Sequence, residues 1–227
     1  MKDEVNSPLE DSPFDKYLTT RKSPDLLTKY RPINLALKLL FACYLILPPM
    51  VVTIYVALLN NNISLMLLAV VGLLPAGLVI LASSFALLLT PKNNEKAAVS
   101  KYLWCLGIGI ALTLTSRFLG GVWAMDLLKK VAQAYSTYYL IGYFEALAFN
   151  FQSFRLADCS HALKQVYVVG LLALIGVMAV SSFFQLPMFA VTTIIAGYCV
   201  GFLFHWLRTV WTAMRVTGGY VYPESEA

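Results

Sequence analysis

The segment ISLMLLAVVGLLPAGLVILASSFALLL, residues 63–89, contains no charged side chain. About 20 helical residues cross the roughly 30 Å hydrocarbon core of a bilayer, so this segment can span it with some tilt. Four further segments are as apolar, and a fifth is more polar. The strong segments are 35–59, 102–124, 166–184 and 187–207, and the weaker one is 132–154.

The composition agrees with a membrane protein. Hydrophobic residues make up 59% of the chain and charged residues only 13%, whereas charged residues are about a quarter of a typical soluble domain. The apolar runs are continuous and lack the short alternating segments of a membrane β-barrel. The sequence therefore predicts an all-α fold, a multi-pass transmembrane helical bundle.

The number of spans depends on whether residues 132–154 cross the membrane. If they do, 14 of the 17 lysines and arginines fall on one side; if they do not, only 10 do. Because basic residues accumulate in cytoplasmic loops, this count favours six spans with cytoplasmic N- and C-termini. Five spans, with 132–154 as an amphipathic helix on the surface, is the alternative.

The spans divide the chain into three parts and three hairpins. Residues 1–31 are a polar cytoplasmic tail too poor in apolar side chains to fold alone, so we expect disorder there. Residues 32–215 form the transmembrane domain, and 216–227 form a short cytoplasmic C-terminal tail. The predicted outer turns of the hairpins are 60–62, 126–130 and 185–186.

Glu145 is the sharpest candidate for chemistry inside the membrane. A carboxylate in hydrocarbon is unfavourable by about 3 kcal/mol, so such a group usually faces a bundle interior or water. Arg117 lies toward the outer end of 102–124, and on antiparallel helices the two Cα atoms would differ by about 9 Å in depth. The sequence thus predicts an intramembrane Arg117–Glu145 pair, unless Arg117 instead reaches the outer headgroups.

Polar and aromatic residues recur along 132–154 at steps of three and four. Tyr138, Tyr139, Glu145 and Gln152 therefore share one helix face. Such a face lines an aqueous or ligand path, or forms an interfacial belt of tyrosines. We expect a polar face packed against other helices.

Two pairs of small residues are spaced for close helix packing. Gly197 and Gly201 form a G-x-x-x-G motif, and Gly107 and Ala111 form its small-residue relative. Such pairs allow two helices to approach closely, either within the chain or between copies.

No motif in the chain reaches the specificity of a known active site. The HExxH, Walker A, GxGxxG and GxSxG patterns are absent, and the four cysteines show no CxxC spacing. We therefore predict no catalytic residues, no metal and no cofactor. The net charge of +5 is spread over helix ends and is not gathered in one patch, so we predict no nucleic-acid partner.

Two classes of function remain. The first is a non-catalytic scaffold, assembly factor or complex subunit of a bacterial cytoplasmic (inner) membrane, with the bilayer and a membrane protein or a second copy as partners. The second is a small transporter or channel whose polar path uses Glu145 and Arg117.

Overall fold

The computed structural model describes residues 24–118, 123–184 and 188–219, and all regular structure in these ranges is helical. The elements are α2 (Pro24–Leu59), α3 (Ile63–Ala86), η1 (Leu87–Leu89), α4 (Asn93–Phe118), α5 (Trp123–Phe151), α6 (Phe154–Phe184) and α7 (Met188–Thr217). Five of the six long helices are long and apolar enough to cross a membrane, and α5 is the exception. The prediction of an all-α membrane bundle is confirmed.

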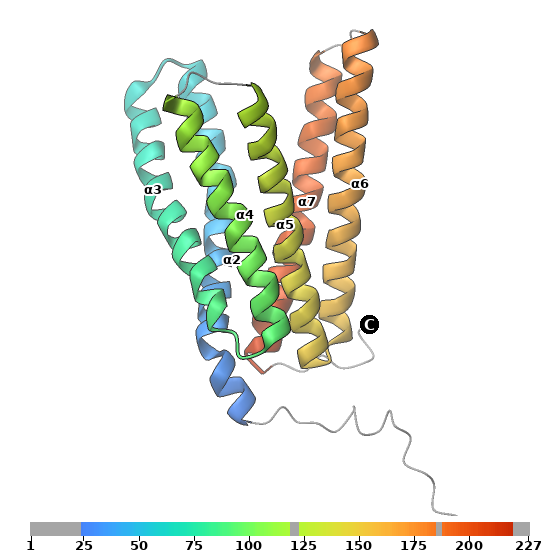
Figure 1. Cartoon of the computed structure of the whole chain (residues 1–227). Coiled ribbons are helices and arrows are strands. Elements are labelled where there is room, and N and C mark those ends of the chain that lie inside the picture. Colours follow the sequence, from blue (N-terminus) through green and yellow to red (C-terminus); the bar gives the residue numbers. More distant parts are fainter. Residues whose placement is uncertain (1–23, 119–122, 185–187, 220–227) are drawn as a thin grey trace, which may run out of the picture.

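Helix α5 contains the segment whose crossing the sequence left open. It runs antiparallel to α4 and α6 and over the same height, so it does not lie across the end of the bundle (Figure 1). One side of α5 is fully buried, through Ile141, Tyr143, Phe144 and Leu147. Because its neighbours cover that side, α5 tolerates a more polar composition than a lipid-exposed helix. If α4 and α6 span a bilayer, α5 spans it with them.

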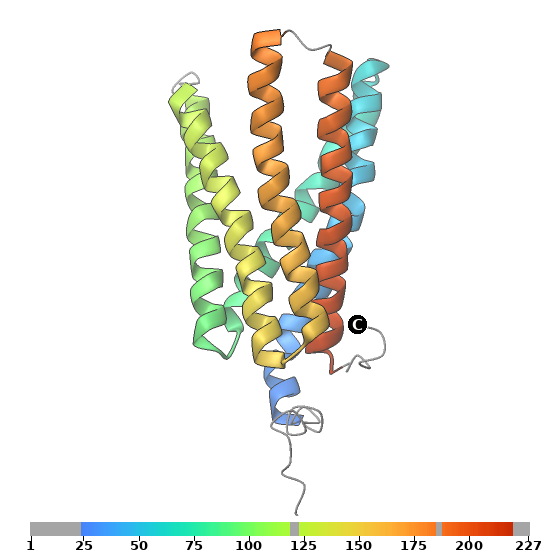
Figure 2. The same ribbon diagram turned by 90° about the vertical axis from the view of Figure 1, so that its right-hand side faces the viewer.

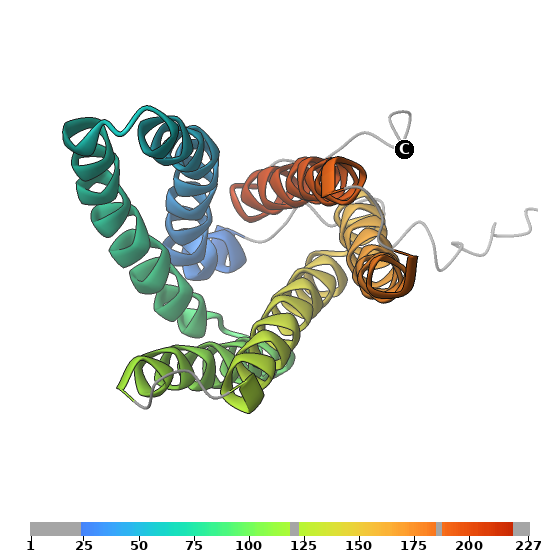
Figure 3. The same ribbon diagram turned by 90° about the horizontal axis from the view of Figure 1, so that it is seen from above.

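The six helices pair as three hairpins: α2 with α3, α4 with α5, and α6 with α7 (Figure 3). We call the end where each hairpin is closed the turn end. Asn62 caps α3 there, its side-chain oxygen accepting a 3.0 Å hydrogen bond from the backbone N–H of Leu65. The start of α2 and the end of α7 lie at the opposite end, where α2 projects beyond the other helices (Figure 2). Asn34 of α2 donates a 2.9 Å hydrogen bond to Thr217 of α7 there.

Two predicted boundaries differ from the structure. Helix α2 begins at Pro24, so residues 24–31 of the predicted tail are helical, and the ring of Tyr30 is fully buried against Phe151. The predicted turn at 126–130 is wrong, since α5 already begins at Trp123. Asp126 lies in the first turn of α5, where the helix dipole favours an acid, and pairs with Lys129 at 3.3 Å. The segments 119–122 and 185–187, which join the helices of two hairpins, lie outside the described residues.

Four helices each have a basic residue at a similar distance in sequence from the turn end. The residues are Lys38, Lys101, Lys164 and Arg208, and we call them the basic belt. Each lies about 20 residues from the turn of its hairpin, which is close to the helix length that crosses a bilayer. On the side of the belt away from the turn end, α2, α4 and α7 each continue for about 12 to 20 Å. We call this part of the molecule the basic end.

Most of the packed core lies at the basic end or next to the belt. Its fully buried side chains include Ile33, Leu37, Val99, Leu147, Leu156, Leu163, Val210 and Val216. Toward the turn end, the three hairpins lie apart from one another (Figure 3). The difference has a physical cause. Water drives apolar burial outside the membrane, whereas within lipid an apolar side chain gains nothing from this effect by packing against another helix.

Candidate functional site

Glu145 is paired, but with a residue that the sequence analysis did not select. Both of its carboxylate oxygens accept hydrogen bonds from the Lys164 ammonium group, at 2.8 and 3.0 Å. This ion pair joins α5 to α6. The side chains of Lys164 and Glu145 are 30% and 33% exposed, so the pair lies at the surface of the bundle.

The backbone does not bring Arg117 close to Glu145. Arg117 is next to the last residue of α4, at the turn end, and its side chain is outside the described part of the structure. Glu145 lies 22 residues beyond the start of α5, which places the two Cα atoms about 30 Å apart along the helices. The expected depth difference of about 9 Å depended on a turn at 126–130. The earlier start of α5 separates the two residues.

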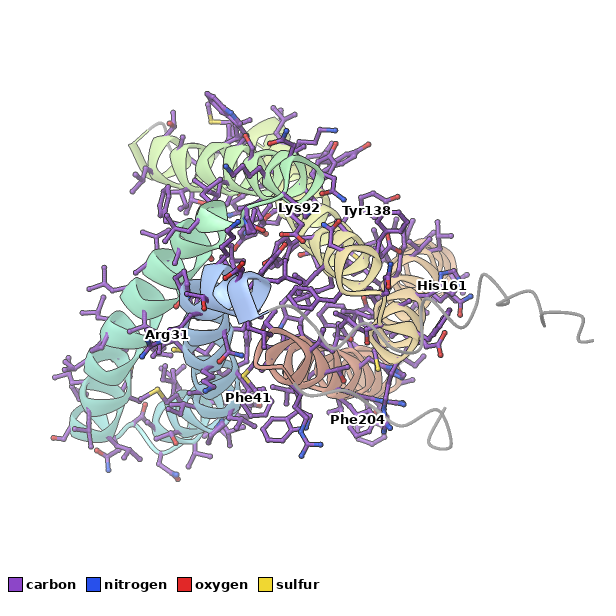
Figure 4. The ribbon with its side chains drawn as sticks, turned by 90° about the horizontal axis from the view of Figure 1, so that it is seen from below. Arg31, Phe41, Lys92, Tyr138, His161 and Phe204 are labelled. Atoms are coloured by element: carbon purple, nitrogen blue, oxygen red, sulfur yellow. The ribbon has the colours of Figure 1, made fainter. Side chains whose placement is uncertain are left out.

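Three tyrosines of α5 form a patch at its outer side: Tyr135 and Tyr138 are exposed and Tyr139 is half-buried, whereas Tyr143 is fully buried. The rings of Tyr135 and Tyr139 are 6.2 Å apart, and those of Tyr138 and Tyr139 are 6.0 Å apart. Tyr138 points away from the centre of the bundle (Figure 4). The expectation that this face packs against other helices holds only in part: Tyr139 packs against the core, whereas Tyr135 and Tyr138 are exposed. The more fully packed face of α5 is the opposite one. Gln152 lies just past the end of α5, with a backbone φ of 49°.

Two lysines lie over this patch. The ammonium group of Lys164 is 5.3 Å from the centre of the Tyr138 ring, and that of Lys101 is 5.7 Å from the centre of the Tyr139 ring. Both distances are within the range of cation–π attraction. We call Lys101, Tyr135, Tyr138, Tyr139, Glu145 and Lys164 together the lysine–tyrosine face.

The small-residue pairs do not lie where two of the described helices pack closely together. A Cβ added at Gly107, Gly197 or Gly201 would meet no atom within 4 Å, and Ala111 is exposed. Other glycines mark close packing instead. At Gly170 of α6 an added Cβ would overlap the ring of Tyr198 from α7.

A second polar cluster, which the sequence analysis missed, is buried at the basic end. Glu95, in the first turn of α4, is fully buried. Its Oε1 atom accepts hydrogen bonds of 2.7 Å from the Tyr30 hydroxyl of α2 and from the Asn150 amide of α5. The sequence held a signal for this burial, because Glu95, Val99 and Tyr102 recur at helical spacing along one face of α4. The lysines around Glu95 made the segment look like an ordinary solvated loop.

Three buried polar atoms lie around this cluster without a hydrogen bond to any described atom. They are Oε2 of Glu95, the Thr90 hydroxyl and the Tyr143 hydroxyl. A carboxyl group buried without a cation in contact favours its neutral form, in which the acid proton can itself be donated to a neighbouring hydroxyl. The cluster connects α2, α4 and α5. Its arrangement suits a structural tie between helices.

Metal-ligating side chains do not gather in the described residues. No group of three or more histidine, cysteine, aspartate or glutamate side chains there could hold a metal ion. His161 lies 3.1 Å from Gln165 on the same helix, at the surface of the bundle (Figure 4).

The apolar helices, the basic belt and the outward-facing ion pair together define an integral membrane protein of the helical-bundle class. Comparisons with protein-family models, with curated proteins and with solved structures found no match to this chain.

Proposed function

We propose that this chain is a non-catalytic component of a bacterial cytoplasmic (inner) membrane: a scaffold, assembly factor or complex subunit that binds another membrane protein. The observation that carries the proposal is the outward position of the Glu145–Lys164 ion pair, whose side chains are about one-third exposed. A polar path for a substrate needs charged or polar groups inside the bundle, between the belt and the turn end. Here the paired charges lie at the surface of the bundle, and not along such a path.

The distribution of charge supports this reading. Between the belt and the turn end, charged residues occur only near the closure of the α4–α5 hairpin: Arg117, Asp126, Lys129 and Lys130. The buried polar cluster around Glu95 lies on the other side of the belt. The membrane part of the bundle is thus apolar along most of its length, as expected for a protein that works through helix contacts.

The proposed orientation places the basic end in the cytoplasm. The belt and the basic residues beyond it lie at the end where α2 begins and α7 finishes. Positively charged residues are retained on the cytoplasmic side of bacterial membranes, so both chain termini would be cytoplasmic.

Open helix faces offer a place for a partner. Gly197 and Gly201 of α7 have free space around them, and small residues let the backbone of a second helix approach closely. Leucine at Gly201 should prevent such an approach and leave the fold intact. Gly176 of α6 also has free space around it but belongs to no small-residue pair, so Gly176→Leu is the matched control.

The test is co-purification of the full chain from its native membrane in a mild detergent. A stable partner or dimer that is lost in Gly201→Leu and retained in Gly176→Leu and Glu145→Gln supports the proposal. Proteoliposomes containing the purified chain test the transporter alternative. Solute or ion flux that disappears in Glu145→Gln, with no partner found, would overturn the scaffold proposal in favour of transport.

A further inference from the structure

We propose that the lysine–tyrosine face binds the phosphate headgroup of an anionic phospholipid, with the ammonium groups of Lys101 and Lys164 as its cationic ligands. The proposal rests on the height of this face in the bundle, its charge and the arrangement of its rings. Lipid binding here does not depend on the chain having a protein partner.

The first step concerns height. Lys101 and Lys164 belong to the basic belt, about 20 residues from the turns that close their hairpins. If the turn end lies at one surface of the bilayer, the belt lies about 30 Å away, where the phosphates of the opposite leaflet are found. Basic side chains at this depth, between transmembrane helices, are a recurring feature of headgroup sites.

The second step concerns charge. Lys101 forms no ion pair in the described part of the chain, whereas Lys164 is held by Glu145. The face therefore has one positive charge in excess, which matches the single negative charge of a phosphodiester. Each basic residue close to an anionic membrane surface contributes about 1 kcal/mol to the attraction.

The third step concerns geometry. The rings of Tyr138 and Tyr139 are neighbours, with their centres 6.0 Å apart, and each has one of the two ammonium groups over it. These contacts keep both lysine side chains directed over α5 and do not leave them to extend separately into solvent. The tyrosine hydroxyls can donate hydrogen bonds to phosphate oxygens, and tyrosine prefers this level of the membrane.

Glu145 has a defined effect in this arrangement. Its carboxylate occupies Lys164 with two hydrogen bonds, so it competes with an incoming phosphate for the same ammonium group. Removal of the Glu145 charge should release Lys164 and strengthen lipid binding. If Glu145 only stabilised the fold, its substitution would not strengthen lipid binding.

The experiment measures lipids bound to the purified full chain by native mass spectrometry, with phosphatidylglycerol and phosphatidylcholine at equal concentration. We expect phosphatidylglycerol to be retained preferentially. Lys101→Gln and Lys164→Gln should each weaken its retention about five-fold, and Glu145→Gln should strengthen it. Lys38→Gln is the matched control, because Lys38 belongs to the same belt but lies on α2, apart from the tyrosines. The Lys38→Gln variant should retain phosphatidylglycerol as well as the unchanged chain does.

Four results would overturn the proposal. Equal retention of the two lipids would show that the headgroup charge is not recognised. Equal losses in Lys38→Gln and Lys101→Gln would assign the effect to the belt as a whole. Displacement of the lipid by inorganic phosphate at the same concentration would show a site for the free ion. If Lys101→Gln keeps its lipid but loses a co-purifying protein, the face binds that protein and not a headgroup.

Discussion

The hydroxyl of Tyr30 donates a 2.7 Å hydrogen bond to Glu95, which lies 65 residues further along the chain. This contact joins the first turns of α2 to the first turn of α4, and Asn150 adds the last turn of α5 to the same carboxyl group. All three side chains lie beyond the basic belt. Specific polar contacts thus hold together the end of the bundle that apolar packing already stabilises.

Substitution of Glu95 should separate the loss of its hydrogen bonds from the loss of its charge. Glu95→Ala leaves the buried Tyr30 hydroxyl without its acceptor and removes one of the two acceptors of the Asn150 amide, so it should lower the free energy of unfolding by about 2 kcal/mol. Glu95→Gln keeps the accepting oxygen and adds an amide that can donate to the Tyr143 or Thr90 hydroxyl, so its stability should equal or exceed that of the unchanged chain. Denaturant unfolding in detergent, followed by circular dichroism, measures both. Equal damage from the two variants would contradict this account.

The Glu145–Lys164 pair should show measurable coupling in a double-mutant cycle. Because both side chains are about one-third exposed, we expect a coupling energy of about 1 kcal/mol in unfolding experiments with Glu145→Gln, Lys164→Gln and the double variant. The same cycle with Arg117→Gln should give no coupling. A larger coupling between Arg117 and Glu145 would restore the pair predicted from the sequence and contradict the helix register.

Single cysteines in a cysteine-free background should report the topology in intact cells. Asp158 is exposed in the first part of α6, so a cysteine at this position is accessible to the label. We expect an impermeant maleimide to label Asn61→Cys from outside, and to label Lys92→Cys and Asp158→Cys only after permeabilisation. Outside labelling of Asp158→Cys with Lys92→Cys protected would mean that α5 does not cross.

Packing between α6 and α7 should be disturbed by an added methyl group at one glycine of α6 and not at another. Gly170→Ala forces the Tyr198 ring to move and should lower the free energy of unfolding by about 1 to 3 kcal/mol. Gly176→Ala enters free space on the same helix and should be neutral or slightly stabilising, since alanine favours the helix. Unfolding of both variants in detergent provides the comparison. Equal effects would show that Tyr198 does not pack against α6 as described.

The sequence predicted the helices well because their signal is local. An apolar run of about 20 residues is sufficient to identify a span, and the three- and four-residue steps of α5 identified the shared face of Tyr138, Tyr139 and Glu145. The turn between α4 and α5 was misplaced because Asp126, Lys129 and Lys130 look like a charged outer loop. Gly120 and Gly121, which lie between the two helices in sequence, were the better signal for a break.

The contacts of Glu145 and Glu95 could not be predicted from local sequence patterns. The partner of Glu145 depends on which helix lies beside α5 at the right height, and Lys164 reaches it only because α6 turns back immediately after α5. Glu95 is buried because α2, α4 and α5 converge beyond the belt. That convergence is a property of the assembled bundle, and no stretch of the sequence encodes it alone.

The confinement of the shared core to the basic end has a mechanical consequence. In the described residues, the hairpins share most of their buried contacts near this end, so the turn ends can tilt apart without disrupting those contacts. Helices that tilt match their apolar length to bilayers of different thickness. The same protein can therefore remain folded in thin and thick membranes, with the spread of the three hairpins following the lipid around them.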